Sequence, residues 1–433
     1  MSPAVEQRGR IKRLADSQFW LPLIVLFFAV VPLFSSRVVT LNYMDMYLYL
    51  GIAEDMLHGK FVLFATPTRT NFYPFMLYCW FELCGYELSS LRLFYIVVLE
   101  LIALQTWVLG WLLFRNHSGL IGAILVVSSF TFGHFTYFPH IDLVLLLFIN
   151  FSLIACLIVY RSEMTESWPW VLTGGCIALA FMVKEAGIWL ILFLPIFSLF
   201  MWVQLKSIAI AWCFQLLPFL AAATGLVAHS GKGYVSRYLS RLNKIANYFT
   251  EDSGRLITRH NSGWIEQGLD HLTPLAKIFI FSISPIFWQW QNSLPVPYLL
   301  IGIEQVMLWV ALVWFLFFVP GYRTAKACIL AVLMIFMPRF LYVAIAGSKV
   351  RQVLPVFYVL YLPLGLMVYL LFQKLYIFIN SSSGRKRAII FVGVCVLAMV
   401  GIRYGLFFNG IDHTLNSADI FYKRPNPLTE FVN

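Results

Sequence analysis

The sequence predicts an all-α polytopic membrane protein with about eleven transmembrane helices and two interfacial helices in its first outer loop. Apolar residues make up 61% of the chain and charged residues 12%, whereas a soluble globular protein carries about 25% charged residues. The net charge of +11 is typical of basic cytoplasmic loops, so it requires no nucleic-acid partner. No repeat or domain boundary is visible, so residues 1–433 are expected to form a single membrane domain.

The first crossing is predicted over residues 19–34, after a basic segment that contains Arg8, Arg10, Lys12 and Arg13. Because basic residues stay on the cytoplasmic side, we expect a cytoplasmic N-terminus. No small-residue cleavage site follows this apolar run, so we expect the helix to be retained. The first outer loop then covers residues 36–90.

Asp45 stands just outside this first crossing, where lipid meets water. A helix over residues 44–58 would place Asp45 and Tyr49 near one face. Ile52 and Met56 share that face, so it is apolar. A carboxylate on the apolar side of an interfacial helix is costly unless it is used, which makes Asp45 the leading candidate for chemistry. The alternative is an aspartate that caps the helix start.

Other segments are assigned by length and charge. A second interfacial helix is predicted over residues 74–85, an apolar run too short to span a bilayer. Residues 278–290, broken by Pro285, are interpreted as interfacial or re-entrant. The long outer loop covers residues 230–296, and the outer C-terminal tail covers residues 409–433. The remaining crossings are expected at residues 91–114, 119–135, 141–160, 170–183, 186–202, 208–228, 298–319, 327–346, 355–374 and 388–408.

This topology brings charged residues from distant parts of the chain to the outer membrane boundary. They are Asp45, His140, Asp142, Lys184, Glu185, Lys349 and Arg351. Such a mixture suits a site that handles an anionic lipid headgroup and a hydroxyl nucleophile. Arg351 suits a phosphate by bidentate donation, and Lys184 and Lys349 suit it as point charges. Asp45 suits a general base, and the intramembrane Arg339 would extend a cationic path toward the site.

These charges also have structural interpretations. Lys184 and Glu185 could form a surface ion pair in a tight turn. The two cations before Pro355 could snorkel at the start of a helix. Asp142 complements the dipole of the helix that it begins, whatever else it does. His140 could be a structural residue of the interface.

Several short motifs share an order along the chain. Asp45 is followed by Tyr49 and then by Ala53, Met56, Leu57 and Gly59. Further matches are Tyr73 and Pro74 with Leu91 and Arg92, residues 139–143, residues 175–195 with Lys184, and residues 351–355. Together they resemble the GT-C membrane glycosyltransferases, the group containing protein O-mannosyltransferases and the lipid A aminoarabinose transferase.

The resemblance implies a GT-C fold and transfer of a sugar from a polyprenyl-phosphate donor at the outer membrane face. It implies Asp45 as the catalytic base, Lys184 and Arg351 as donor-phosphate contacts, and Asp142 as a site acid. Further site candidates from the matched motifs are Tyr49 and Tyr73.

The chain also departs from the family pattern. Met46 replaces the acidic neighbour of the aspartate, and Glu185 replaces the glycine after the lysine. The resemblance therefore assigns no second acid in the first loop and no acceptor. A glycan, a glycolipid and a protein all fit the acceptor, and the involvement of a divalent metal is left open.

The expected location is an integral membrane position with the site outside the cytoplasm, on the periplasmic side of a bacterial inner membrane. The donor and membrane lipid are the expected partners. A transporter or flippase of lipid-linked sugars is the alternative function, with Arg339, Glu304 and Arg403 lining its path. A third interpretation, favoured by Met46, is a scaffold subunit without activity.

Overall fold

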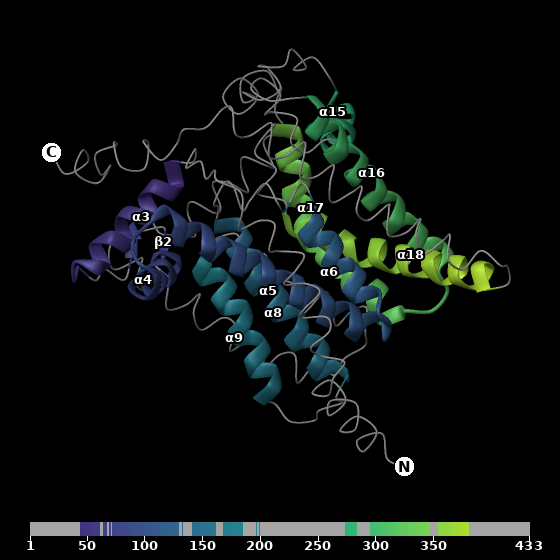
Figure 1. The fold of residues 1–433 in the computed structure, drawn as a ribbon, viewed down its shortest axis with the longest axis horizontal. Helices are drawn as coiled ribbons and strands as arrows, with labels where there is room; N and C mark the ends of the chain where they lie inside the picture. Colours follow the sequence, from purple (N-terminus) through teal and green to yellow (C-terminus); the bar gives the residue numbers. More distant parts are fainter. Residues whose placement is uncertain are drawn as a thin grey trace.

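The computed structural model of the chain describes residues 44–60, 64–66, 69–70, 72–129, 132, 141–161, 168–184, 196, 199, 273–283, 295–346 and 354–380. These residues form a helical assembly (Figure 1). Among them, three helical segments are long and apolar enough to cross a bilayer: Ser89–Phe114, Ile141–Arg161 and Pro355–Lys374. The chain is an integral membrane protein, as its composition predicts. The expected crossings at residues 19–34, 208–228 and 388–408 lie outside the described part, as does the crossing at 186–202 apart from residues 196 and 199.

The segment expected to form the first outer loop contains helix α3 (Met44–Leu57) and helix α4 (Phe72–Cys84). Both helices follow the predicted positions, and they pack against each other. The buried face of α3 includes Tyr49, Ile52 and Met56, as the helical spacing predicts.

Between these two helices the chain forms a small antiparallel hairpin. Strand β1 (Phe64–Thr66) pairs with strand β2 (Arg69–Thr70). Aromatic and threonine residues favour extended backbone, which explains why so short a segment forms strands.

Helices α5 (Leu88–Phe114) and α6 (Ser118–Ser128) form a tight antiparallel pair. Arg115 ends α5 in the left-handed conformation, with φ of 59°, and its N–H donates to the carbonyl of Trp111. A Cβ on Gly110 would lie 2.2 Å from the Cα of Gly119, so the glycines allow the two backbones to touch. Helix α6 ends at Ser128, well before the end of the crossing expected at residues 119–135.

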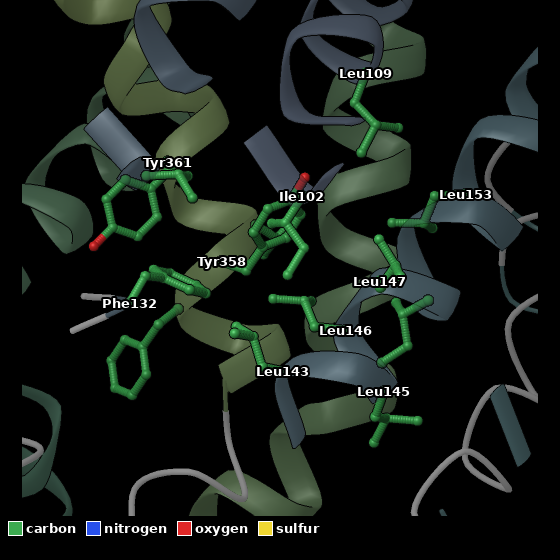
Figure 2. Close-up of a cluster of buried hydrophobic side chains, with 14 of the residues drawn as sticks. Ile102, Leu109, Phe132, Leu143, Leu145, Leu146, Leu147, Leu153, Tyr358 and Tyr361 are labelled. Carbon is green, nitrogen blue, oxygen red and sulfur yellow. The ribbon is translucent and has the colours of Figure 1, made fainter. Parts of the chain in front are cut away.

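Helix α8 (Ile141–Arg161) packs beside α5, and helix α9 (Trp168–Val183) packs beside α8. The side-chain amide of Gln105 donates to the carbonyl of Leu147 at 3.0 Å, which joins α5 to α8 through a buried polar group. Figure 2 shows Tyr358 in the same cluster of buried side chains as Ile102 of α5 and Leu146 of α8.

The second half of the described chain contains α15 (Pro274–Ile283), α16 (Pro295–Phe318), α17 (Arg323–Ala346) and α18 (Leu354–Asn380). Helix α15 starts at a proline, which is favoured at the first helical position, and so begins before the segment expected at residues 278–290. Helix α18 contacts α6, α16 and α17 (Figure 1). The close passage at Gly122 and Gly365 lets α18 approach α6 at backbone distance.

Candidate active site

An ion pair joins the start of α8 to the end of α9. Lys184 follows the last residue of α9, and its ammonium Nζ donates to Oδ1 of Asp142 at 2.5 Å. The side chain of Asp142 is 3% exposed and that of Lys184 is 18% exposed, so water screens this pair little. Two residues that the sequence placed at one membrane level, 42 positions apart, are therefore in direct contact.

The helix ends favour the same charges. Asp142 is in the first turn of α8, where backbone N–H groups carry partial positive charge. Lys184 follows the C-terminal end of α9, where backbone carbonyls carry partial negative charge, and its own N–H donates to the carbonyl of Ala180. Asp142 thus lies where the helix dipole favours an acid, and the charge of Lys184 has a structural explanation in its buried partner.

A pair of buried tyrosines lies between α4 and α5. The hydroxyls of Tyr73 and Tyr95 are hydrogen-bonded to each other, and neither residue is exposed to solvent. The Tyr73 hydroxyl also donates to the sulfur of Met46 at 3.5 Å. The ring of Tyr49 stands edge-to-face against that of Tyr73, with centroids 5.1 Å apart. Helices α3, α4 and α5 thus meet at one point.

Burial raises the pKa of the Tyr73 hydroxyl well above its ordinary value. The hydroxyl therefore stays protonated at physiological pH and acts here as a hydrogen-bonding group. Tyr73 is a site-positioning candidate on this ground.

The tyrosines and the ion pair lie in the same region of the molecule. The carboxylate of Asp142 acts electrostatically on the hydroxyl of Tyr95, as do Tyr73 and Tyr49. Helix α4 also contacts α9, which ends at Val183, directly before Lys184. We call this group the polar cluster, and it consists of Tyr49, Tyr73, Tyr95, Asp142 and Lys184. Four of these five residues are candidates from the sequence.

Asp45 belongs to the same corner of the molecule through its backbone. It is the second residue of α3, directly before Met46, whose sulfur contacts the tyrosine pair. Tyr49 of the polar cluster follows Asp45 by one helical turn. The side chain of Asp45 lies outside the described part of the structure.

Several further candidates lie outside the described residues: His140, Glu185, Lys349 and Arg351. Arg351 precedes the first residue of α18 by three positions. Arg339 lies in α17, and its side chain is likewise outside the described part.

Sequence reasoning missed Tyr95 and the burial of Met46. Tyr95 lies in the first crossing after the loop, one helical turn past Leu91, and nothing in its apolar surroundings distinguishes it from a core residue. Met46 is 1% exposed and fills the space beside the tyrosine pair. The position that is acidic in the family pattern is therefore part of the core in this chain.

The residues that the structure describes do not contain a group of three or more His, Cys, Asp and Glu side chains that could hold a metal ion. Asp142, the described acid of the polar cluster, has the ammonium of Lys184 at 2.5 Å from its Oδ1. A metal ligand would instead direct its carboxylate oxygens at the ion. The described residues thus do not fit a metal centre.

No protein-family model and no curated protein sequence matches the chain. Among solved structures, the chain is similar to ArnT from Cupriavidus metallidurans bound to undecaprenyl phosphate, with a TM-score of 0.56 and 14% sequence identity. The match covers 96% of this chain and 68% of ArnT.

The chain is also similar to the oligosaccharyltransferase AglB from Archaeoglobus fulgidus, in complex with an inhibitory peptide and a dolichol-phosphate. That match has a TM-score of 0.56 and 14% identity, and covers 91% of this chain and 56% of AglB. A second structure of the enzyme, tethered to an acceptor peptide, gives a TM-score of 0.56 at 15% identity, with 91% and 55% covered. ArnT and AglB are both GT-C membrane glycosyltransferases. The fold that the sequence motifs implied is confirmed: this chain has a GT-C fold.

Proposed function

We propose that this chain is a membrane glycosyltransferase that moves a sugar from a polyprenyl-phosphate donor to a hydroxyl group of a glycan, glycolipid or protein. The transfer takes place at the extracytoplasmic face of the membrane. Support comes from the GT-C fold and from two structural neighbours that hold a polyprenyl phosphate, undecaprenyl phosphate in ArnT and dolichol-phosphate in AglB. The chain spans 68% of ArnT and 56% of AglB.

The observation that carries the proposal is the polar cluster beside the start of α3. Five helices meet at this corner of the molecule: α3, α4, α5, α8 and α9. Four of them carry a residue of the polar cluster, and α9 ends directly before Lys184. The helix that begins there carries Asp45 in its first turn. An acid that begins a helix packed against such a cluster is a candidate for the catalytic group.

In the proposed reaction, the carboxylate of Asp45 accepts the proton of the acceptor hydroxyl. The acceptor oxygen forms a bond to the anomeric carbon while the bond from that carbon to the phosphate oxygen breaks. The phosphate leaves with the bonding electron pair, and attack from the opposite face inverts the configuration. A positioned general base contributes about 10²- to 10⁴-fold in rate.

The leaving phosphate gains negative charge, and we assign its stabilisation to Arg351, Lys349 and Lys184. An ammonium has three N–H donors, so a phosphate oxygen can share Lys184 with Asp142. Asp142 then serves to hold the ammonium in place. Preorganised charge of this kind is commonly the largest single contribution to catalysis.

The test is transfer by purified protein in detergent, with radiolabelled undecaprenyl-phosphate monosaccharides as donors and membrane lipid extract as acceptor. The variant Asp45→Asn should transfer about 10²- to 10⁴-fold more slowly while binding undecaprenyl phosphate as the wild type does. The matched control is Asp55→Asn, on the same helix, whose carboxylate pairs with the exposed Lys60 at 3.6 Å. This control should keep both properties.

Full transfer by Asp45→Asn would overturn the role of this carboxylate. Detergent solution has no second compartment, so a flippase gives no transfer in this assay. A wild type that moves labelled donor across liposomes but transfers no sugar would replace the enzyme proposal with the transporter one.

A further inference from the structure

Arginines from separate parts of the chain gather at the end of the bundle opposite the polar cluster. Asp142 is in the first turn of α8, and Arg161 is the last residue of that helix. At about 1.5 Å of rise per residue, these two residues are about 28 Å apart along α8. This distance matches the hydrocarbon core of a bilayer, which is about 30 Å thick. Arg161 therefore stands at the second membrane boundary, far from the polar cluster.

An aromatic contact brings two further arginines to this end. The ring of Phe114, the last residue of α5, stands edge-to-face against that of Tyr322, with centroids 5.5 Å apart. Arg115 directly follows Phe114, and Arg323 directly follows Tyr322 and begins α17. The charge of Arg115 also acts electrostatically on Arg161. We call Arg115, Arg161 and Arg323 the arginine cluster.

The backbone at this junction has an uncommon conformation. Among the described residues, Arg115 and Tyr322 are the non-glycine residues with a positive φ, at 59° and 52°. This left-handed region is disfavoured for residues with a side chain. The turn before α17 is held by Lys326, whose ammonium donates to the carbonyls of Leu316 and Val319 at 2.9 Å and 2.7 Å. The arginine cluster is therefore attached to turns of defined geometry.

Like charges held close together favour the binding of an anion. The described residues 111–120, 157–161 and 315–327 contain no Asp or Glu. Backbone carbonyls at the ends of α5 and α8 favour a cation at each end, but they do not remove the repulsion between Arg115 and Arg161. A phosphate group would do so, because it accepts paired N–H donors from a guanidinium.

The surroundings favour a lipid as the source of the phosphate. Helix α16 ends beside the arginine cluster, since the ring centroids of Phe315 and Phe114 are 5.7 Å apart. The last turns of α16 expose apolar side chains: Val313 is 49% exposed, Phe317 78% and Phe318 73%. In a membrane protein such side chains contact acyl chains, and basic pockets between transmembrane helices are typical sites for anionic headgroups. Inorganic phosphate would use none of this apolar surface.

We propose that the arginine cluster binds the phosphate of an anionic phospholipid, in the leaflet opposite the polar cluster. The guanidiniums of Arg115 and Arg161 donate to the phosphate oxygens, and the acyl chains lie along the exposed face of α16. The lipid stays chemically unchanged, and its role is to hold the ends of α5, α8 and α17 together. This inference goes beyond the proposed function and does not depend on sugar transfer.

The test is a titration of phosphatidylglycerol into the purified protein in neutral detergent. Native mass spectrometry measures the bound lipid, and the thermal midpoint is recorded at each concentration. The wild type should bind phosphatidylglycerol about tenfold more tightly than zwitterionic phosphatidylcholine. Its thermal midpoint should rise with phosphatidylglycerol, because a ligand of the folded state stabilises it.

Variants of the two arginines test the contact itself. Arg115→Gln and Arg161→Gln should each weaken phosphatidylglycerol binding by about tenfold, through the loss of hydrogen bonds to a charged group. Arg161→Lys keeps the charge but loses the bidentate geometry, so it should weaken binding by about three- to tenfold. Without added lipid, both Arg→Gln variants should keep or raise the wild-type thermal midpoint, because each removes a like-charge repulsion.

Lys374→Gln is the matched control. Lys374 is an exposed cation at the end of the membrane-spanning segment Pro355–Lys374. Its replacement should change the affinity for phosphatidylglycerol by less than about threefold, as expected for one exposed charge.

Four results would overturn the lipid site. The first is equal affinity of the wild type for phosphatidylglycerol and phosphatidylcholine. The second is an equal loss of affinity in Lys374→Gln and the Arg→Gln variants, or wild-type affinity in Arg161→Lys, because either shows general attraction to the membrane surface. The third is a lower lipid-free thermal midpoint in both Arg→Gln variants, which shows that the arginines pair with a carboxylate of this chain, such as Glu163 or Glu166. The fourth is displacement of phosphatidylglycerol by an equal concentration of undecaprenyl phosphate, which assigns the arginine cluster to an isoprenoid lipid.

Discussion

Removal of the buried ion pair is the perturbation for which the structure gives the clearest magnitude. Breaking a buried pair by deleting one partner costs about 3–5 kcal/mol, because the other charge is left without compensation. The two partners differ in burial, 3% exposure for Asp142 and 18% for Lys184. Lys184→Met leaves the more buried charge, so we expect a loss of about 3–4 kcal/mol. Asp142→Ala leaves the more hydrated ammonium, so we expect about 2–3 kcal/mol.

The measurement is the free energy of unfolding from denaturant titration in detergent at pH 7, for the wild type, both single variants and the double variant. The double variant removes both charges, so it should regain about 2 kcal/mol relative to the sum of the single losses. Lys60→Met is the control, because Lys60 and Asp55 are 3.6 Å apart and exposed. It should change the free energy by less than about 0.5 kcal/mol. If each single variant lost no more stability than the control and the two losses simply added in the double variant, the buried ion pair would be refuted.

The remaining predictions concern packing and pH. Gly365→Ala places a Cβ within 2.8 Å of the backbone N of Gly122, so it should lower the free energy of unfolding by about 1–3 kcal/mol. Gly175 has open space around it, so Gly175→Ala should change the free energy of unfolding by less than about 0.5 kcal/mol. Equal thermal midpoints for the two variants would contradict the close packing. Burial and then the carboxylate beside it raise the pKa of Tyr86. The stability that Tyr86 contributes is therefore full below the ordinary tyrosine pKa of about 10 and is lost as the pH rises above it toward the raised pKa of the folded state. Tyr86→Phe should therefore flatten the fall of the thermal midpoint above about pH 10. An unchanged slope would show that Tyr86 does not cause the fall. Met46→Ala should cost about 2–5 kcal/mol and Met46→Leu less than about 1.5 kcal/mol in the same titration; a harmless alanine would contradict its place in the core.

The sequence predicted the helices of the described part well where apolar length decides the structure. Helices α8 and α9 lie close to the apolar runs expected at residues 141–160 and 170–183. Helix α8 is also long and apolar enough to cross a bilayer, because a membrane helix must satisfy its backbone internally over a fixed apolar span. The hairpin of β1 and β2 was not predicted, since strands of three and two residues carry too little periodicity for a strand signal.

The sequence predicted which site residues share a membrane level, but it did not predict their contacts. Asp142 and Lys184 stand at the ends of two neighbouring segments that were expected to cross the membrane, so the expected topology alone brought them to one level. The contacts among Tyr73, Tyr95 and Met46 depend on how α3, α4 and α5 meet in three dimensions, which a linear pattern does not encode. The partner of Lys184 could not be read from the sequence for the same reason, because Glu185 is closer in the chain.

The central claim is that Asp45, the polar cluster and the cations before α18 surround one donor site. An experimental structure of the protein with undecaprenyl phosphate tests it most directly. The account predicts the phosphate oxygens within about 3 Å of the Arg351 guanidinium, with the Asp45 carboxylate and the Lys184 ammonium facing the same cavity. A lipid phosphate bound elsewhere, with the Asp45 side chain directed into lipid and away from Lys184, would contradict the account.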